Sequence, residues 1–481
     1  MAAETKLAAV PSPDVASELA ARLERVRRAQ RHEGTISLRA RRAALDRLAR
    51  ALVEHKDSLV AAIDADFNGR SHHESLIAEI FTSIKGLRHT HKHLAEWMRP
   101  QRRSVGLLFQ PARAEVRYQA LGVVGIISPW NYPVYLAIGP IAAAIGAGNR
   151  VMLKPSEHTP RTSQALAQLL DAIFPRDYVD VVTGGPEVGR AFSALPFDHL
   201  LFTGSTEVGR HVMRAASANL TPVTLELGGK SPAIVGENAR FSHAVTSIAR
   251  GKLLNAGQTC IAPDYALVPS AQLERFVDAM RDTVATLYPT LGDNRDYSAI
   301  INAHHHQRLR ALLADAEQKG ARLVPLNPAG EDRDALGNKI APTLVLDVND
   351  EMQIMREEIF GPLLPVLPYR DLGEALDHVN ARPRPLALYL FDERREVVDR
   401  VLDQTISGGV CVNDTLVHIA PDDLPFGGVG DSGMGHYHGF DGFETFSKKK
   451  PIFHQSRFSA LSMMAPPYGK LVERLLGWLI R

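Results

Sequence analysis

The chain has 481 residues, of which 45% are hydrophobic and 23% are charged, and its formal net charge is +1. This composition is that of a globular protein, and at ~150 residues per domain the length predicts about three domains with buried cores. The balanced charge gives no electrostatic reason to expect a nucleic-acid partner, so a small-molecule ligand is favoured.

The N-terminal part of the chain carries no targeting or membrane pattern. Glu4 comes early, and no apolar core follows it, so the pattern of a secretory signal is missing. Ten arginines between Arg22 and Arg50 are interleaved with leucines and valines at helical spacing, which is typical of solvated faces of amphipathic helices. The longest apolar run, residues 134–148, is too short to span a bilayer. We therefore expect a cytoplasmic protein with no integral membrane segment.

The predicted elements fall into a helical start followed by two alternating series. The pattern is helical from about Ala16 to Met98 and becomes extended from Leu107 to Gln119. Strand-like and helix-like stretches then alternate, which predicts parallel βαβ units in a doubly wound sheet. A second such series begins near Gly228, and residues 445–455 return to an extended pattern.

The last stretch, KLVERLLGWLIR from Lys470, has one apolar helix face. We expect this face to pack against the rest of the protein. Capping a substrate tunnel, touching a membrane surface and covering a partner subunit are the other roles open to it.

The chain contains only two cysteines, Cys260 and Cys411. They cannot build a disulfide framework, which fits a reducing compartment. Cys411 in the strand-like GGVCVN is expected to be a small buried residue. Cys260 in LNAGQTCIAP lies among turn residues, where packing does not require it, and is a candidate nucleophile. A free thiol has a pKa of roughly 8.5, so this role needs a base or a positive local field.

Two further motifs offer groups that would serve such a thiol. Glu226 in TLELGGK is flanked by leucines and followed by two glycines that allow close approach. A carboxylate in that setting would have a raised pKa suited to a general base. Asn131 in PWNYP follows a buried strand and lies between two prolines, where its amide could donate to an oxyanion.

The cofactor signal is LLFTGSTEVGRHVM, in which a strand end, a small-residue turn and a helix follow one another. The turn from Gly204 to Gly209 includes Ser205, and the free N–H groups of the helix start could bind a pyrophosphate. MLKPSE supplies Lys154 and Glu157, a donor and an acceptor suited to ribose hydroxyls. An ordinary surface ion pair is the alternative for these two.

Three other patterns are set aside. GGKS at residues 228–231 resembles the end of a phosphate-binding loop, but the required glycine is replaced by Thr224. GVGDSG at residues 428–433 opens no helix and is expected to be a loop whose glycines need positive φ angles. His304 to His306 have no metal-ligand spacing, so a helix start is expected there and no metal site.

Taken in order, the motifs resemble the aldehyde dehydrogenase superfamily. They are PWNYP (129–133), KPSE (154–157), FTGSTEVG (202–209), LELGGKSP (225–232), GQTC (257–260), EEIFGP (357–362) and LPFGGVGDSGMG (424–435). Jointly they are highly specific, although no single one is. The last motif with its continuation, and the wording GQTCIAPDY, resemble the class 3 branch and within it the bacterial coniferyl aldehyde dehydrogenase type.

The resemblance implies an α/β fold with a Rossmann-like cofactor domain, an α/β catalytic domain and a small β-ribbon oligomerisation domain. The expected boundaries are residues 1–106 and 121–227 for NAD binding, 228–440 for catalysis, 107–120 and 441–456 for the ribbon and 457–481 for a helical tail. A homodimer is also implied, since the long N-terminal extension of tetrameric relatives is not seen.

The family pattern assigns roles to matching residues. It makes Cys260 the nucleophile and Glu226 the general base, and it places Asn131 and the backbone N–H of Cys260 in the oxyanion hole. The thiolate would attack an aldehyde to give a thiohemiacetal, hydride loss would leave a thioester, and water activated by Glu226 would release the acid. No metal is implied.

The pattern also assigns the cofactor contacts. Lys154 and Glu157 would bind the adenine ribose, the turn from Gly204 to Gly209 would face the phosphates, and Glu358 would hold the nicotinamide ribose with Phe360 beside the ring. Glu157 would repel the 2′-phosphate of NADP, so NAD is expected, although class 3 relatives often accept both.

The substrate is less constrained by these patterns. Tyr132 is a candidate for lining a tunnel that suits aromatic or long apolar aldehydes, and core packing is the alternative for its ring. A general aliphatic aldehyde scavenger, a CoA-acylating dehydrogenase, a cysteine thioesterase or amidase and an inactive binding relative remain open. The carboxylate at Glu226 argues against the CoA-acylating enzyme, and the two cofactor motifs argue against the thioesterase or amidase. The intact set of Cys260, Glu226, Asn131 and Glu358 argues against the inactive relative. Asp431 departs from the Asn or small residue frequent in class 3, which leaves local loop contacts open.

Overall fold

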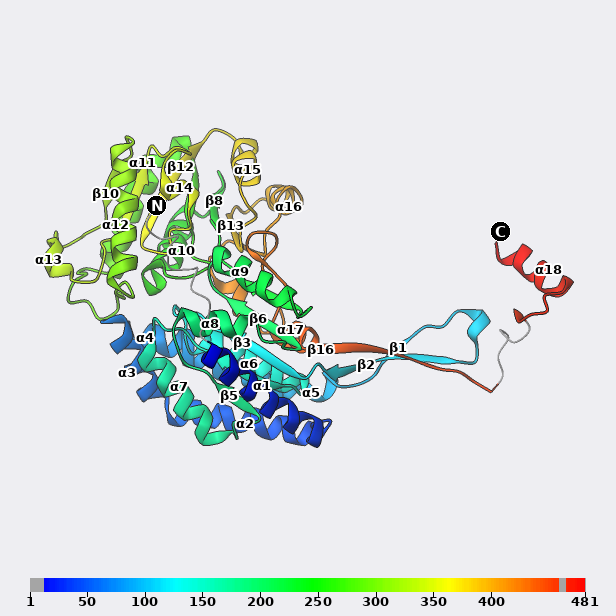
Figure 1. Ribbon diagram of the computed structural model, residues 1–481. Coiled ribbons are helices and arrows are strands. Elements are labelled where there is room, and N and C mark those ends of the chain that lie inside the picture. Colours follow the sequence, from blue (N-terminus) through cyan, green and yellow to red (C-terminus); the bar gives the residue numbers. More distant parts are fainter. Residues whose placement is uncertain (1–12, 458–463, 481) are drawn as a thin grey trace.

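The computed structural model describes residues 13–457 and 464–480. Figure 1 shows two α/β bodies and a long ribbon that leads away from them. The predicted fold class, with a Rossmann-like part, a second α/β part and a β-ribbon, is confirmed. The first residues, in which the sequence shows no secretory signal, lie outside the described residues. No helix within the described ranges is long and apolar enough to cross a bilayer.

The first part of the chain is all helical, as its leucine spacing predicts. It consists of α1 (Pro13–Glu33), α2 (Leu38–Glu54), α3 (Lys56–Phe67), α4 (His72–Ser75), the π-helical turn η2 (Leu76–Phe81) and α5 (Thr82–Trp97). Leu45, Leu48 and Leu52 of α2 are fully buried. Arg22 of α1 pairs with Asp180 at 3.0 Å. The arginine-rich stretch therefore forms outer faces and anchors of two packed helices.

The first sheet has the order β15-β7-β6-β3-β4-β5, and its strands are parallel except for β15. The strands are β3 (Val123–Ile127), β4 (Arg150–Lys154), β5 (Val179–Val181), β6 (His199–Thr203), β7 (Val223–Glu226) and β15 (Gly433–Met434). The helices that connect them are α6 (Tyr135–Ala147), α7 (Pro160–Ile173), α8 (Pro186–Ser193) and α9 (Thr206–Ser217). The chain leaves β3 toward β4 and later returns to β6 on the other side, which creates a switch point where such sheets bind ligands.

The second sheet has the order β10-β11-β12-β9-β8-β13-β14, and only β10 is antiparallel to its neighbour. The strands are β8 (Pro232–Val235), β9 (Tyr265–Pro269), β10 (Arg322–Pro325), β11 (Thr343–Leu346), β12 (Leu363–Tyr369), β13 (Ala387–Phe391) and β14 (Gly409–Val412). The helices are α10 (Phe241–Leu253), η4 (Leu254–Gly257), η5 (Ser270–Gln272), α11 (Leu273–Leu287), α12 (Ala303–Gln318), α13 (Arg333–Leu336), α14 (Gln353–Arg356), α15 (Leu372–Asn380), α16 (Arg395–Gln404) and η6 (Val417–Ile419). The following helix, α17 (Gly439–Thr445), packs against α5 and α6 of the first part.

The ribbon is a three-stranded antiparallel sheet of β1 (Gln101–Arg103), β2 (Arg113–Ala120) and β16 (Ser447–His454). A turn of 3₁₀ helix, η3 (Leu107–Phe109), lies between β1 and β2. Two boundaries differ from the predicted ones. β1 precedes the predicted start at residue 107, because its three polar residues carry no strand pattern. β15 belongs to the first sheet, although the sequence predicts residues 228–440 as one catalytic domain.

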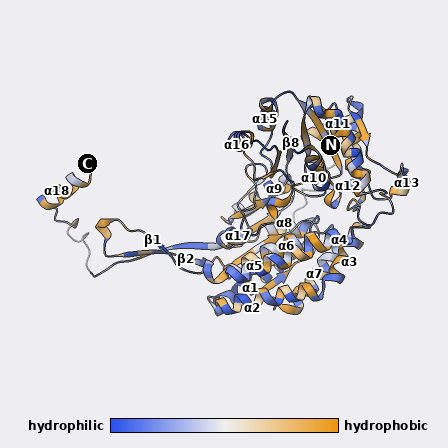
Figure 2. Cartoon of the chain, turned by 180° about the vertical axis from the view of Figure 1, so that it is seen from behind, coloured by the Kyte–Doolittle hydropathy of each residue, from blue (hydrophilic) through white to orange (hydrophobic). Residues whose placement is uncertain are grey.

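The C-terminal helix α18 (Lys470–Leu479) lies beyond the far end of the ribbon (Figure 1). The expectation that its apolar face packs against the chain is wrong for most of this face: Leu471, Trp478 and Ile480 are 59%, 71% and 80% exposed, and Val472 is buried. Figure 2 shows the hydrophobic colouring of this helix next to the largely hydrophilic ribbon. The ribbon holds the helix away from the two α/β bodies, so no core is within its reach.

Candidate active site

Four of the predicted site residues follow neighbouring strands of the first sheet. Asn131 follows β3, Lys154 ends β4, Gly204 follows β6 and Glu226 ends β7. These strands are parallel and adjacent. Their carboxyl ends therefore meet at one edge of the sheet, and the fold brings the four residues to that edge.

Cys260 comes from the other half of the molecule, in the loop that follows α10 and η4. The backbone of residues 255–257 is left-handed, with φ angles of 53°, 50° and 75°. Such a conformation costs about 1–3 kcal/mol for a non-glycine residue and is found where the surroundings fix it. Cys260 is a free cysteine that stays partly exposed at the end of this loop.

The side chain of Gln258 fixes this loop. Its Nε2 donates to the carbonyl oxygens of Asn255 and Ala299 at 2.9 and 3.0 Å, and its Oε1 accepts from the N–H of Ile301 at 3.0 Å. Gln258 is fully buried, so a substitution there would leave several polar groups unpaired. The three hydrogen bonds of the Gln258 side chain thus hold the loop that carries Cys260.

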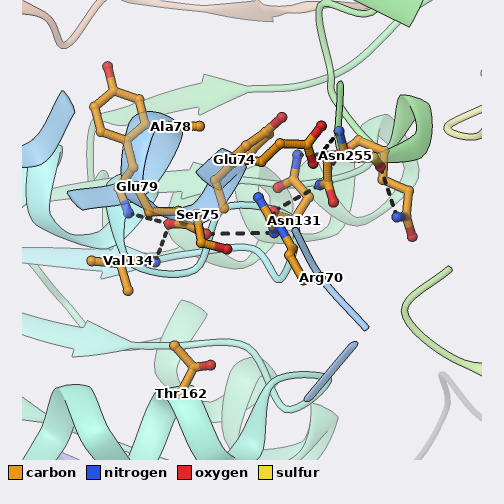
Figure 3. A network of polar contacts seen from close by, with 12 residues as sticks. Arg70, Glu74, Ser75, Ala78, Glu79, Asn131, Val134, Thr162 and Asn255 are labelled. Carbon is orange, nitrogen blue, oxygen red and sulfur yellow. Dashed lines mark hydrogen bonds and ion pairs between the residues drawn. The ribbon is translucent and has the colours of Figure 1, made fainter. Parts of the chain in front are cut away.

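Asn131 lies against the same loop (Figure 3). Its Nδ2 donates to the carbonyl oxygen of Gln258 at 3.2 Å. Its own carbonyl oxygen accepts from Asn255 Nδ2 at 3.1 Å and from an Arg70 guanidinium nitrogen at 2.5 Å. The amide predicted for the oxyanion hole therefore lies two residues from Cys260, at the backbone of the loop that presents the thiol.

A buried ion pair contacts the loop that carries Asn131. Arg70 and Glu79 are both fully buried and lie 3.6 Å apart. Glu79 accepts from the N–H groups of Val134 and Tyr135 at 2.9 Å, at the start of α6. The Arg70 guanidinium lies 4.8 Å from the centre of the Tyr132 ring. Arg70 and Glu79 thereby fix the middle and the α6 end of the loop between β3 and α6, a link that Figure 3 traces.

Glu226 is buried, and neither of its carboxyl oxygens has a hydrogen-bond partner within the described part of the chain. Its strand is flanked by β6 and β15, with Gly433 directly opposite Glu226. Burial raises the pKa of Glu226 well above its usual value. An unpaired carboxylate of this kind is suited to accept a proton.

The thiol of Cys260 is not activated by a nearby cation. Burial, together with the carboxylates of Glu358 and Glu226, raises its pKa to about 12. The thiol is therefore protonated at neutral pH, and a base must remove its proton before it can attack. Of the two possibilities that the sequence analysis named, a positive field is not seen around the thiol among the described residues, so its activation falls to a base.

A cavity of about 130 Å³ lies between Cys260 and Glu226. Cys260 and Glu226 line it together with Tyr132 and a mostly apolar wall. The Tyr132 hydroxyl is 2.7 Å from Thr259 Oγ1, and its ring is 7% exposed. Tyr132 therefore lines the cavity and also packs in the core, so both roles that the sequence analysis considered for its ring apply.

Residues 2–452 match the aldehyde dehydrogenase family. The chain belongs to this family. It is 57% identical over 425 residues to the probable coniferyl aldehyde dehydrogenase of Pseudomonas aeruginosa, with 88% of each chain covered. It is 47% identical over 471 residues to the coniferyl aldehyde dehydrogenase of a Pseudomonas sp., with 98% of each chain covered. The predicted family and activity, NAD(P)-dependent oxidation of an aldehyde, are confirmed.

Solved structures of aldehyde dehydrogenases share the fold. Staphylococcus aureus AldH in a substrate-bound state superposes with a TM-score of 0.91 at 36% identity, covering 96% of this chain and 99% of that one. An indole-3-acetaldehyde dehydrogenase complexed with NAD+ gives a TM-score of 0.84 at 27% identity, covering 92% and 89%. The fold similarity therefore extends over nearly all of this aldehyde dehydrogenase.

Glu358 of this aldehyde dehydrogenase approaches the site from the second sheet. A Cβ on Gly228 would lie 2.1 Å from the Glu358 carboxylate, so only glycine allows this approach. Glu358 Oε1 is buried without a partner in the described residues, and burial with the charge of Asp264 raises the pKa of this carboxyl to about 8. Its carbonyl oxygen accepts from Arg308 at 3.2 Å. The backbone is anchored, the carboxyl group accepts a backbone hydrogen bond from Gly229, and Oε1 stays available for a ligand.

The other predicted cofactor residues lie along the first sheet. Lys154 Nζ donates to Glu157 at 2.6 Å, so the two form an ion pair at the end of β4. Ser205 caps α9 by accepting from the N–H of Val208 at 3.4 Å. Gly209 is buried where a Cβ would lie 2.6 Å from Leu227, so its small size serves helix–strand packing.

These groups fit a dinucleotide. The first turn of α9 begins at the carboxyl end of β6 beside Gly204, which is the arrangement that binds phosphates. Lys154 and Glu157 supply donor and acceptor groups, and Glu358 supplies an unpartnered acceptor for a second ribose. Phe360 has a φ of 50°, and its ring centre is 5.3 Å from that of Trp130.

The patterns that were set aside have structural roles. Lys230 of GGKS pairs with Asp264 and donates to Glu357 O at 3.0 Å, which anchors the loop that carries Glu358. Gly430 and Gly433 of GVGDSG have positive φ angles, as expected, whereas Gly428 does not. The helix predicted at the histidine run begins at Ala303 as α12. Cys411 is buried in β14, as expected. No group of metal-ligating side chains is found among the described residues.

Sequence reasoning missed the groups that hold the site together. Arg70 and Glu79 lie in a stretch of the chain rich in charged residues, most of which are exposed, so the burial of these two charges is hard to predict. Gln258 was read only as a polar turn residue. The one available signal was local: Glu79 lies between Ala78 and Ile80 in a run that an amphipathic helix would not interrupt with a charge.

Proposed function

We propose that the protein oxidises an aromatic, coniferyl-type aldehyde to the carboxylic acid, with Cys260 as nucleophile. The observation that carries this proposal is the single cavity in which Cys260 and Glu226 meet a wall of aromatic and aliphatic side chains. Such a wall binds a flat apolar substrate and orients it by a few polar groups. The names of the two Pseudomonas relatives support the substrate class.

The residues of the chain perform the chemistry in turn. A base takes the proton of Cys260, and Sγ attacks the aldehyde carbon to form a thiohemiacetal. The Asn131 amide and the N–H of Cys260 stabilise the oxyanion. NAD, when bound, supplies the hydride acceptor whose reduction leaves a thioester on Cys260. Glu226 then takes a proton from the attacking water, and the acid is released.

NAD is the proposed cofactor. Glu157 is negatively charged beside the ribose-binding position and would repel a 2′-phosphate, and the indole-3-acetaldehyde dehydrogenase neighbour was solved with NAD+. Lys154 and Glu157 would hold one ribose, the α9 turn at Gly204 the phosphates, and Glu358 the other ribose. NADP as a second, weaker cofactor is compatible with this arrangement.

The test is to mix the purified protein with NAD and follow NADH absorbance after adding coniferyl aldehyde, with hexanal in parallel and Cys260→Ala as the inactive control. Rapid NADH formation with coniferyl aldehyde and little with hexanal is expected. The reverse preference would identify a general aliphatic scavenger, for which the apolar cavity also has room. Activity only after adding CoA would identify an acylating dehydrogenase and contradict the role of Glu226.

We also propose a cytoplasmic homodimer. β14 and the outer strands of the ribbon are sheet edges, and Leu402, Ile406 and Val412 beside β14 are 44%, 54% and 39% exposed. Exposed apolar sheet edges are places where a second chain pairs. Light scattering should give twice the 52.7 kDa mass of the chain. A single-chain mass at micromolar concentration would contradict the dimer.

A further inference from the structure

The substrate cavity carries an ion pair that the proposed mechanism does not use. Only three charged side chains line the cavity: Glu226, Lys85 and Asp422. Glu226 is the proposed base. Lys85 on α5 and Asp422 in the loop after η6 lie 2.7 Å apart and connect the two walls of the cavity.

The burial of the lining side chains places this pair at the mouth. The side chains of Lys85 and Asp422 are 42% and 22% exposed. Glu226, Leu227 and Tyr437 line the same cavity and are 3%, 4% and 2% exposed. An aldehyde group that reaches the floor therefore leaves the distal end of its substrate near the ion pair.

Lys85 and Asp422 have unused hydrogen-bonding capacity. Lys85 Nζ forms the ion pair with Asp422 and donates to the carbonyl oxygen of Ala420 at 2.6 Å, so it keeps an N–H group for a ligand. Within the described parts of the chain, Lys85 is the ion-pair partner of the Asp422 carboxylate. The neighbouring hydroxyls of Thr82 and Tyr135 are already paired, with Ala78 O at 2.6 Å and with His438 at 3.2 Å.

We propose that Lys85 and Asp422 bind a hydroxyl group on the distal ring position of an aromatic aldehyde and so select para-hydroxylated substrates. The Asp422 carboxylate accepts the phenolic O–H, and the free N–H of Lys85 donates to the same oxygen. A para hydroxyl conjugated with an aldehyde is an acidic phenol, so a carboxylate beside an ammonium is a matched partner for it. This inference rests on the proposed function and names the residues that determine its substrate class.

The test compares three aldehydes of similar length with the full-length protein and NAD. They are 4-hydroxy-3-methoxycinnamaldehyde, 3,4-dimethoxycinnamaldehyde, which lacks the donor, and cinnamaldehyde, which lacks the oxygen. Wild type should prefer the hydroxylated aldehyde over cinnamaldehyde by about tenfold or more in kcat/KM. In Lys85→Met and in Asp422→Asn this ratio should fall toward one, mainly through KM.

Lys92→Met is the matched control, because Lys92 lies exposed on the same helix and does not line the cavity. Its three kcat/KM values should equal those of wild type. A wild-type ratio near one, or an unchanged ratio in both Lys85→Met and Asp422→Asn, would overturn the inference while aldehyde oxidation itself stands. A wild type that forms no NADH with any of the three aldehydes would overturn the proposed function, and this inference with it.

Discussion

The two sides of Cys260 are built in opposite ways. On the Asn131 side the groups that touch the Cys260 loop are paired: the Asn131 carbonyl has two donors, its amide has an acceptor, and Gln258 uses both ends of its side chain. Further from the thiol on this side, two Arg70 nitrogens, Glu79 Oε1 and Asn255 Oδ1 are buried without a hydrogen-bond partner among the described residues. On the Glu226 side, both carboxyl oxygens of Glu226 and the hydroxyl of Thr203 are buried without partners among the described residues.

The difference reflects what each side has to do. Oxyanion stabilisation requires donors that are already in place, so the Asn131 side is fixed before substrate arrives. Proton transfer requires a carboxylate that is free to meet a water molecule, so the Glu226 side is left open. Leaving a carboxyl group buried and unpaired raises its pKa, and here that penalty produces the basicity that the reaction needs.

Substituting Glu226, on the open side, should give the largest effect on turnover. We expect Glu226→Gln to lower steady-state turnover by about 10²–10⁴-fold, since an amide cannot take a proton from water. The first turnover should survive as a burst of NADH, because the loss falls on thioester hydrolysis. In wild type, hydrolysis should rise with pH through a pKa above that of an ordinary Glu, because only the deprotonated form is a base, and this rise should vanish in the variant.

Stopped-flow NADH absorbance separates the burst from the steady state. Glu396→Gln on the exposed face of α16 is a suitable control that should leave both phases unchanged. A Glu226→Gln variant with wild-type steady-state turnover would show that another group activates the water.

Removing the Asn131 side-chain amide should slow the NADH burst itself. We expect Asn131→Ala to reduce the burst rate by about 10²–10³-fold, the usual effect of losing one oxyanion donor. Thioester formation would then limit turnover, so the burst amplitude should disappear. Retention of a fast burst in this variant would argue that the backbone N–H of Cys260 is sufficient.

The support beneath Asn131 should matter less, and in a graded way. Glu79→Gln keeps an acceptor for the N–H groups of Val134 and Tyr135 but loses the charge that faces Arg70, so we expect a burst about tenfold slower. Glu79→Leu loses both the acceptor and the charge, so its burst should be slower still. The KM for NAD should not change, whereas general destabilisation would move kcat and KM together. Glu96→Gln on the exposed face of α5 is the control.

The smallest effect concerns the reactivity of the thiol. Because Glu358 and Glu226 raise the pKa of Cys260, the variants Glu358→Gln and Glu226→Gln should lower it. Alkylation by iodoacetamide at a fixed pH near 8 should then be severalfold faster in both, measured in a Cys411→Ala background. Equal rates in wild type and variants would mean that neither carboxylate is charged beside the thiol.

The sequence predicted the fold class and three residues that the fold brings to one site, because each lies in a short local pattern. Asn131 follows a strand between prolines, Glu226 ends another strand, and Cys260 is a thiol where packing needs none. It could not predict the ion pair of Arg70 and Glu79, because the burial of a charge depends on which distant segments cover it. It also misplaced the C-terminal helix, since an apolar face does not specify its partner.

One pairing in the first sheet has a consequence for how the protein is made. Glu226 ends β7, and the neighbour of β7 on its outer side is β15, which comes from near the end of the chain. A ribosome has therefore synthesised nearly the whole polypeptide before the strand that carries the base acquires its last neighbour. A nascent or truncated chain that stops before Gly433 leaves β7 as an open edge, so the catalytic base is among the last parts of the enzyme to be put in place.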